Sequence, residues 1–271
     1  MSLEYEIRAA RSGPPDPAHG WQLIADRFRM ISIVDYGMGN LRSVQKGLEK
    51  AGSSAVIVRT PEAVRSASKL ILPGVGAFGD AMKHLRERDL IEPVCEFARS
   101  GRPFLGICLG LQLLFESSEE GVDEPDVLAS SSAAETSASR PAPERAPSPG
   151  PASADPQVEI PGLGLLPGRV VRFNFRDIPS ARGLKVPHMG WNTVTWDQPS
   201  PLLAGLTSGT YFYFVHAYHA VPADRSVTLG ICDYGYPFAA MVQRDNIFAT
   251  QFHPEKSQQA GLTILRNFAA L

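Results

Sequence analysis

The chain has 271 residues, 44% hydrophobic and 20% charged, and its 26 basic against 28 acidic residues leave a formal charge of −2. This is the composition of a globular protein. It lacks the basic excess with which proteins bind nucleic-acid phosphates. No run of 18 apolar residues and no signal-peptide core occur, so we expect neither a membrane span nor secretion. The three cysteines form no CxxC and no zinc pattern, which indicates a reduced, cytoplasmic protein without a metal site.

Two segments of the sequence are unsuited to a folded core. Residues 1–29 are rich in Gly and Pro, and in residues 129–157 Ala, Ser and Pro supply 21 of 29 positions. Neither segment can bury enough apolar surface to offset the entropy of ordering it. We therefore expect a disordered N-terminal extension, with Met30 as the functional start, and a low-complexity insertion at 129–157 that interrupts one domain at 30–271. A linker between two domains is the alternative for the second segment.

The first half of this domain alternates between predicted strands and helices. Each short apolar strand is followed by a turn and then by apolar residues at helical spacing, and the strands are expected at 31–35, 55–58, 70–72 and 104–107. Thr60 and Pro61 form a helix start, and Leu111–Gly121 is predicted to be a helix and its end. Fully apolar strands that alternate with helices indicate a parallel sheet covered on both faces.

After the insertion the sequence becomes rich in strands. They are expected at 169–173, 193–196, 211–218, 227–232, 239–243 and 247–252. A final helix from Ser257 would pack Leu262, Leu265 and Phe268 against the core. The predicted fold class is therefore α/β, with a central parallel-to-mixed sheet flanked by helices in a single domain.

Cys108 stands at a turn that is typical of a nucleophile. The segment FLGICLGLQLL predicts a strand, a turn with Gly106 and Gly110 on either side of the cysteine, and a helix. This is the thiol counterpart of the G-x-S-x-G nucleophile elbow, which lifts a side chain out of the carboxyl end of a sheet. A helix N-terminus also favours the thiolate. A buried cysteine is more often a small apolar residue, and we expect that role for Cys95 and Cys232, which have no flanking glycines.

A base for this thiol is available near the C-terminus. His253 precedes Pro254, so the backbone there should be extended, and Glu255 then lies on the same side two residues on. Glu255 can accept a hydrogen bond from one imidazole nitrogen while the other faces a thiol, which is the arrangement of a catalytic triad. The alternative is a surface turn before the last helix.

A glycine-rich turn, PGVGAFG at 73–79, follows the third predicted strand. A peptide flanked by glycines can direct its N–H at a developing oxyanion, or rotate away at little steric cost. A tight turn between a strand and a helix is the simpler alternative.

The sequence resembles the glutaminase subunit family of imidazole glycerol phosphate synthase, a class I glutamine amidotransferase of histidine biosynthesis. The cysteine turn with a late His-x-Glu marks class I amidotransferases in general, and three further segments narrow the resemblance to this subunit: VDYGMGNLRS, VPHMGWNTV and FYFVHAY. The resemblance covers nearly all of 30–271 apart from the insertion.

The resemblance implies a role for each matching residue. Cys108 would attack the side-chain amide of glutamine, His253 would act as base and then as acid, and Glu255 would orient His253. The oxyanion donors would be the main-chain N–H groups of Val75 and Leu109. The glutamine pocket would include Gly76, Gln112, Ala217 and Tyr218. Relatives often carry Ser or Thr where Ala217 stands, so any hydroxyl contribution is absent here.

The resemblance also implies a partner and no cofactor. A (β/α)8-barrel cyclase subunit would take up the ammonia in a heterodimer, because the chain has no second domain that could do so. Trp191 is the expected anchor of that interface, although a Trp in an apolar segment is alternatively a core residue. Around it the resemblance groups Pro187, Met189, Asn192, Tyr213 and Lys256.

Three other functions remain open at this point. The chain could be the amidotransferase of another synthase, which the PHMGWN and DYGMGN segments disfavour. It could be a non-catalytic interaction subunit, which would not need Cys108, His253 and Glu255 together. A stand-alone cysteine hydrolase would differ by showing glutaminase activity without any partner.

Overall fold

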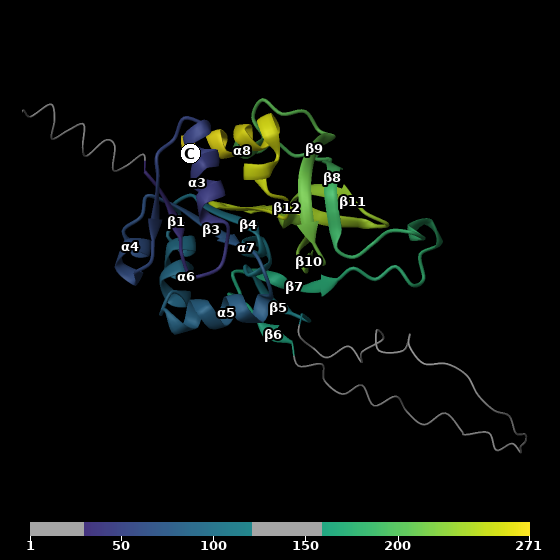
Figure 1. The fold of residues 1–271 in the computed structure, drawn as a ribbon, viewed down its shortest axis with the longest axis horizontal. Coiled ribbons are helices and arrows are strands. Elements are labelled where there is room, and N and C mark those ends of the chain that lie inside the picture. The colour runs from purple at the N-terminus through teal and green to yellow at the C-terminus, as the bar shows by residue number, and fades with distance from the viewer. Residues whose placement is uncertain (1–29, 121–158) are drawn as a thin grey trace, which may run out of the picture.

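A computed structural model describes residues 30–120 and 159–271 of the chain (Figure 1). The expected N-terminal extension at 1–29 and the expected insertion at 129–157 lie outside the described residues. The structure therefore leaves both as predictions.

A seven-stranded sheet forms the centre of the described fold. Its strands lie in the order β11 (Thr228–Asp233), β12 (Pro237–Arg244), β13 (Ile247–Thr250), β4 (Phe104–Cys108), β3 (Lys69–Gly74), β1 (Ile31–Val34) and β2 (Ala55–Val58). The run from β2 to β13 is parallel, and β12 and β11 continue it in antiparallel pairs. This confirms the predicted α/β fold with a parallel-to-mixed sheet.

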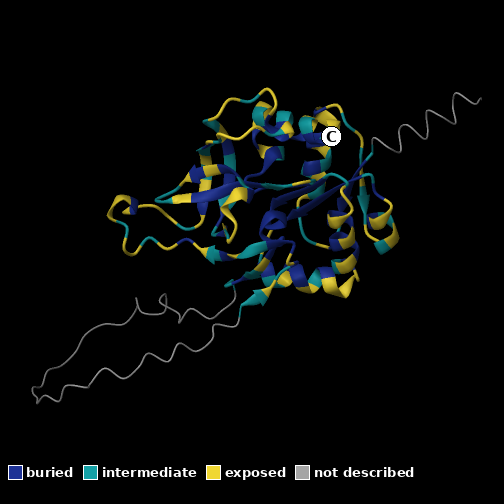
Figure 2. Ribbon diagram, turned by 180° about the vertical axis from the view of Figure 1, so that it is seen from behind, coloured by how far each residue is buried: buried dark blue, intermediate teal, exposed yellow. Residues whose placement is uncertain are grey.

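Helices cover both faces of this sheet, as Figure 1 shows. One core contains the inner sides of α4 (Pro61–Arg65), α5 (Phe78–Glu87) and α6 (Ile91–Arg99), and the other contains those of α3 (Leu41–Lys50) and α8 (Gln258–Ala270). Figure 2 shows the burial pattern that results, with buried central strands and exposed outer helix faces. In α8 the buried apolar side chains are Ile264, Leu265 and Phe268, whereas the expected Leu262 is only half-buried.

The predicted helix at Leu111–Gly121 was wrong beyond its first residues. Helix α7 spans only Leu109–Gln112, and strand β5 (Phe115–Ser118) follows it. Main-chain N–H groups of residues 162–166 donate to the carbonyls of residues 113–116, which draws this stretch out of a helix. The strand belongs to a second sheet in the order β10 (Tyr218–Pro222), β7 (Leu166–Arg172), β5 and β6 (Ile160–Pro161). Tertiary pairing has overridden the local helical pattern.

A two-stranded antiparallel ribbon pairs β8 (His188–Val194) with β9 (Thr210–His216). The strand expected at 193–196 thus begins at His188, five residues earlier, because the whole stretch pairs with β9. Alternate residues point to opposite faces of a strand. Phe212, Phe214 and His216 are buried on the inner face, and Met189 and Trp191 are exposed on the outer face.

Candidate active site

Three neighbouring parallel strands end at one edge of the central sheet, and each delivers a predicted site segment. Gly74 of β3 is paired with Cys108 of β4, and Ile107 is paired with Thr250 of β13. The chain after β13 reaches His253 three residues later. Ligands of α/β sheets bind at the carboxyl ends of the strands. The topology therefore brings the glycine turn, the cysteine and the histidine together.

Cys108 occupies a strained turn, as the elbow pattern predicts. Its φ of 55° lies in the left-handed region, which a non-glycine residue adopts only when its surroundings enforce it. Neighbouring main-chain atoms lie so close to Gly106 and Gly110 that only glycine fits at these two positions. A Cβ on Gly110 would lie 1.9 Å from the main-chain oxygen of Leu72, and a Cβ on Gly106 would lie 2.7 Å from that of Gly110. Helix α7 makes a single turn, so its dipole offers the thiolate little beyond the nearest N–H groups.

His253 and Glu255 make the contact that the sequence predicts. Nδ1 of His253 lies 2.9 Å from Oε1 of Glu255. The backbone is extended at His253, but Pro254–Lys256 form a 3-10 turn instead of continuing extended. Because a carboxylate only accepts, the imidazole donates from Nδ1. The other nitrogen, Nε2, is buried without a hydrogen-bond partner among the described residues, and His253 lines the same pocket as Cys108.

The surroundings of His253 favour its protonated form. Burial alone would lower the pKa of His253, but interaction with Cys108 and the hydrogen bond to Glu255, together with the negative charges of both, raise it well above its usual value. Nε2 of His253 makes no hydrogen bond to the thiol of Cys108 that meets the usual limits of distance and angle. The negative charge of a Cys108 thiolate would still act on the imidazole across the pocket. His253 is therefore set to carry a proton in the folded protein.

The other two cysteines are placed for packing only. Cys95 on α6 and Cys232 on β11 are both buried, and neither is in a disulfide. Burial raises the pKa of the Cys95 thiol and raises that of Cys232 to about 12, so both stay protonated.

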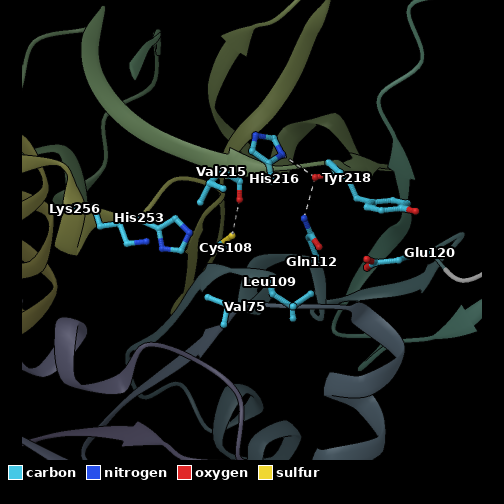
Figure 3. A pocket seen from close by; sticks show the side chains of 12 residues that line it. Val75, Cys108, Leu109, Gln112, Glu120, Val215, His216, Tyr218, His253 and Lys256 are labelled. Carbon is cyan, nitrogen blue, oxygen red and sulfur yellow. Dashed lines mark hydrogen bonds between the residues drawn. The ribbon is translucent and has the colours of Figure 1, made fainter. Parts of the chain in front are cut away.

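A cavity of about 260 Å³ opens beside Cys108 (Figure 3). Its size suits a small metabolite such as an amino acid. Most of the predicted glutamine-site residues line it: Val75, Gly76, Cys108, Leu109, Gln112, Ala217, Tyr218 and His253. Lys256, predicted for a partner surface, also lines it.

The cavity wall includes three residues that sequence reasoning missed: Glu120, Val215 and His216. Of the residues that the structure describes, Glu120 is the one acidic side chain in the wall, and its Oε2 accepts a hydrogen bond from Phe78 N at 2.8 Å. Burial raises the pKa of Glu120, and that N–H partly offsets the effect. Its position in a presumed helix end concealed it in the sequence, whereas His216 was visible as the histidine of the FYFVHAY segment.

The glycine turn is held at its start by a buried tyrosine. The hydroxyl of Tyr36 donates to the main-chain oxygen of Pro73 at 2.9 Å, directly before Gly74. Burial, with a smaller effect of Cys108, raises the pKa of Tyr36, so it remains a donor. Gly76 has a φ of 92°, a conformation open to glycine at little cost. The turn is therefore anchored at Pro73, and at Gly76 it takes a conformation that suits glycine.

The predicted partner residues divide between the two faces of the ribbon. Met189 and Trp191 are 63% and 46% exposed, so Trp191 is not a core residue. Trp191 pairs with Tyr213 across the strands, with ring centroids 6.0 Å apart. Pro187 and Lys256 are exposed as well. Asn192 lies on the inner face instead, where its amide donates to the main-chain oxygen of Asp233 at 2.9 Å.

Neither a metal centre nor a membrane segment is found in the described residues. Within 30–120 and 159–271, no three His, Cys, Asp or Glu side chains are grouped so that they could hold an ion. No helix in this part of the chain has the length and apolarity needed to cross a bilayer.

Comparison with known proteins identifies the family. A family model described as glutamine amidotransferase class-I matches residues 32–270. The chain belongs to this family. Solved structures share the fold: a glutamine amidotransferase crystal structure has a TM-score of 0.57 with 18% identity, over 89% of this chain and 99% of that one. The PurLQS structure from Thermotoga maritima has a TM-score of 0.58 with 17% identity, over 88% and 96% of the two chains.

Curated relatives of higher identity narrow the family further. The chain is 49% identical to the imidazole glycerol phosphate synthase subunit HisH of Syntrophotalea carbinolica, over 88% of this chain and 98% of the relative. It is 43% identical to the subunit of the same name from Geobacter sulfurreducens, over 89% and 98% of the two. The chain is thus a glutamine amidotransferase of the HisH family.

Proposed function

We propose that the chain hydrolyses glutamine through a Cys108–His253–Glu255 triad and delivers the ammonia to the cyclase subunit of imidazole glycerol phosphate synthase. The observation that carries this proposal is the orientation of His253. Its Nδ1 is bound to Glu255, its Nε2 is buried without a hydrogen-bond partner among the described residues, and His253 lines the cavity that Cys108 also lines.

Each step of the reaction has a group to perform it. The thiolate of Cys108 attacks the side-chain amide carbon, forming a C–S bond and a tetrahedral oxyanion, for which the main-chain N–H groups of Val75 and Leu109 are the proposed donors. The C–N bond then breaks as His253 gives its proton to the departing ammonia. Neutral His253 next takes a proton from water, which attacks the thioester and releases glutamate and the thiolate. Glu255 keeps the imidazole in one orientation throughout.

The cavity wall supplies complementary groups for an α-amino acid. We assign Gly76, Gln112, Ala217 and Tyr218 to the glutamine pocket. Glu120 joins them as the partner of the α-ammonium group, because it is the acidic side chain of the wall. An ammonium ion beside this half-buried carboxylate would stabilise the charge of both.

Free ammonia would be protonated and lost in water, so the proposal includes a second subunit. The relatives named HisH are subunits of a synthase, which supports a heterodimer with a (β/α)8-barrel cyclase in the cytoplasm. The proposed contact surface is centred on Trp191, with Pro187, Met189, Asn192, Tyr213 and Lys256 around it. Its exposed aromatic and thioether side chains are typical of protein interfaces.

Labelling with a glutamine-analogue electrophile tests the proposal. We expect covalent modification of Cys108, located by peptide mass spectrometry, and none of Cys95 or Cys232. Excess glutamine should protect the thiol, whereas excess glutamate at the same ionic strength serves as the matched control. Labelling at either buried cysteine, or labelling of Cys108 that glutamine does not slow, would contradict the assignment.

A further inference from the structure

A chain of hydrogen bonds runs along the inner face of the β8–β9 ribbon. Nδ2 of Asn192, which donates to the main-chain oxygen of Asp233, also lies 3.4 Å from Nε2 of His188. Nδ1 of His188 lies 3.1 Å from Nε2 of His216. Nδ1 of His216 lies 2.8 Å from the main-chain oxygen of Tyr218. These hydrogen bonds therefore connect the ribbon to the wall of the cavity.

The side-chain amides of two buried residues, Gln112 and Gln251, extend this series of hydrogen bonds to Cys108. Nε2 of Gln112 donates to the main-chain oxygen of Tyr218 at 2.9 Å and to Oε1 of Gln251 at 3.1 Å. Nε2 of Gln251 lies 3.7 Å from Sγ of Cys108. Both hydrogens of the Gln112 amide are thus used, which leaves its Oε1, an acceptor, for a ligand. Figure 3 shows the His216 ring and the Gln112 amide converging on the Tyr218 oxygen.

Each imidazole proton in this series of hydrogen bonds has one possible position. A carbonyl oxygen only accepts, so His216 carries its proton on Nδ1 and accepts at Nε2. His188 then donates from Nδ1 and accepts at Nε2 from Asn192. A second proton on either ring would set one N–H against another. Both imidazoles are therefore neutral and fixed in a single tautomer.

The surroundings favour the neutral state of both rings. His188 and His216 are 3% and 6% exposed, and aromatic side chains such as Phe173 and Phe214 enclose them. Burial lowers the pKa of His216 to about 3 and that of His188 to about 4. Among the described residues, the titratable groups that face the pair are His219, His253 and Tyr234, and no carboxylate acts on either ring to raise its pKa.

We infer that His216 and His188 are positioning residues of the glutamine site, an inference that rests on the proposed function. The Nδ1–H of His216, held in place by His188, fixes the Tyr218 carbonyl, and this carbonyl fixes the Gln112 amide with its acceptor oxygen available to the substrate. The pair thereby sets the affinity for the amino acid and leaves the reactivity of the thiol to His253 and Glu255.

Two substitutions of His216 separate hydrogen bonding from packing. The amide nitrogen of an Asn side chain can lie where Nδ1 of the imidazole lies. The amide nitrogen of the longer Gln side chain can lie where Nε2 lies. H216N therefore keeps a donor to the Tyr218 oxygen, whereas H216Q loses it although it fills more of the ring's volume. If only packing mattered, H216Q would resemble the wild type more closely than H216N does.

Inactivation of the full chain by 6-diazo-5-oxo-L-norleucine measures affinity and chemistry separately. We expect H216Q to raise the half-saturating concentration about tenfold or more and H216N to stay within about threefold of wild type. The limiting rate should change less than about threefold in both variants, and so should alkylation by iodoacetamide, which does not occupy the amino-acid subsite. H188F, which retains the ring stack, should raise the half-saturating concentration less than H216Q does.

The outcomes distinguish this inference from the proposed function. If the wild type is labelled at Cys108 but H216Q binds the analogue as well as H216N, the positioning role is wrong and the function stands. If the wild type is not labelled at Cys108, both fail. Nitrogen-15 NMR of histidine-labelled wild-type chain needs no variant to fold. It should show His216 as the Nδ1–H tautomer at about pH 7, and an Nε2–H tautomer or an imidazolium would overturn the inference.

Discussion

His253 and His216 line the same cavity, yet their neighbours hold them in opposite protonation states. The thiol of Cys108 and the carboxylate of Glu255 raise the pKa of His253 despite its burial. Burial lowers the pKa of His216, as it does those of His188 and His219, and the charge of His253 lowers that of His216 further. Among the described residues, no carboxylate acts on these three rings.

Burial alone therefore does not assign a role to a histidine. Removal from water disfavours the imidazolium at every one of these positions, and a nearby negative charge decides whether that effect is overcome. A buried histidine beside a carboxylate can store a proton for a leaving group. One that faces carbonyl oxygens and other imidazoles holds a fixed tautomer and serves to orient its neighbours.

The largest effect is expected from removing the negative charge beside His253. E255Q should lower kcat for glutamine about 10²–10⁴-fold, because the imidazole loses both its orientation and its stabilised charge. Since Glu255 raises the pKa of His253, its loss should also move the alkaline limb of the kcat profile to lower pH. Steady-state rates measured across pH check both effects. E119Q, which removes a carboxylate outside the cavity wall, is the matched control. An unshifted alkaline limb in E255Q would show that Glu255 does not keep His253 protonated.

A smaller effect is expected from acidification, which acts on the neutral histidines. The folded state lowers their pKa values, to about 3 for His216 and about 4 for His219. Below about pH 6.5 these histidines therefore bind protons in the unfolded chain but stay neutral in the folded chain. Stability should therefore fall as the pH falls from about 6.5 to about 4. The loss should be about 1–2 kcal/mol for each of these two residues at about pH 5. Urea unfolding at about pH 7 and about pH 5 measures it.

H219Q serves as the control for this acid sensitivity. Its amide can replace Nε2 of His219, which lies 2.9 Å from the hydroxyl of Tyr236. The variant no longer titrates, so it should lose less stability on acidification than the wild type. Equal losses in the two proteins would show that His219 is not held neutral.

The smallest effect on the stability of the chain is expected from a substitution on the outer face of the ribbon that carries His188. Trp191 is half-exposed, so W191A should change the unfolding free energy by less than about 1 kcal/mol and leave the acid sensitivity as it is. Binding of the cyclase subunit, followed by titration calorimetry, should weaken about tenfold or more. Unchanged partner affinity would remove Trp191 from the proposed interface, and an altered acid sensitivity would mean that the two faces of the ribbon are not independent.

The residues of the proposed triad could be predicted from the sequence because their signals are local. The two glycines around Cys108 and the two-residue spacing of His253 and Glu255 are each set within a few residues, and apolar strands with helices between them determine the parallel sheet. The family resemblance added Gly76, Gln112, Ala217 and Tyr218 to the pocket, and all four line the cavity.

The remaining features depend on contacts between distant segments. Helix α7 ends after one turn because residues 113–116 pair with residues 162–166, on the far side of the undescribed stretch. For the same reason the position of Glu120 in the cavity wall was hidden. The link between His188 and His216 exists only through the register of β8 with β9, in which these two residues are directly opposite. Local propensity contains no information about such pairings.

The short pairing of β5 with β6 has a practical consequence. It sets Ser118 opposite Ile160, so a chain inserted between residues 120 and 159 starts and finishes at neighbouring points. It also starts directly after Glu120, a side chain of the cavity wall. A fluorescent protein joined to the chain at this site would need no long tether to span the fold, and a change in its emission on adding glutamine would test the proposed binding in the cavity.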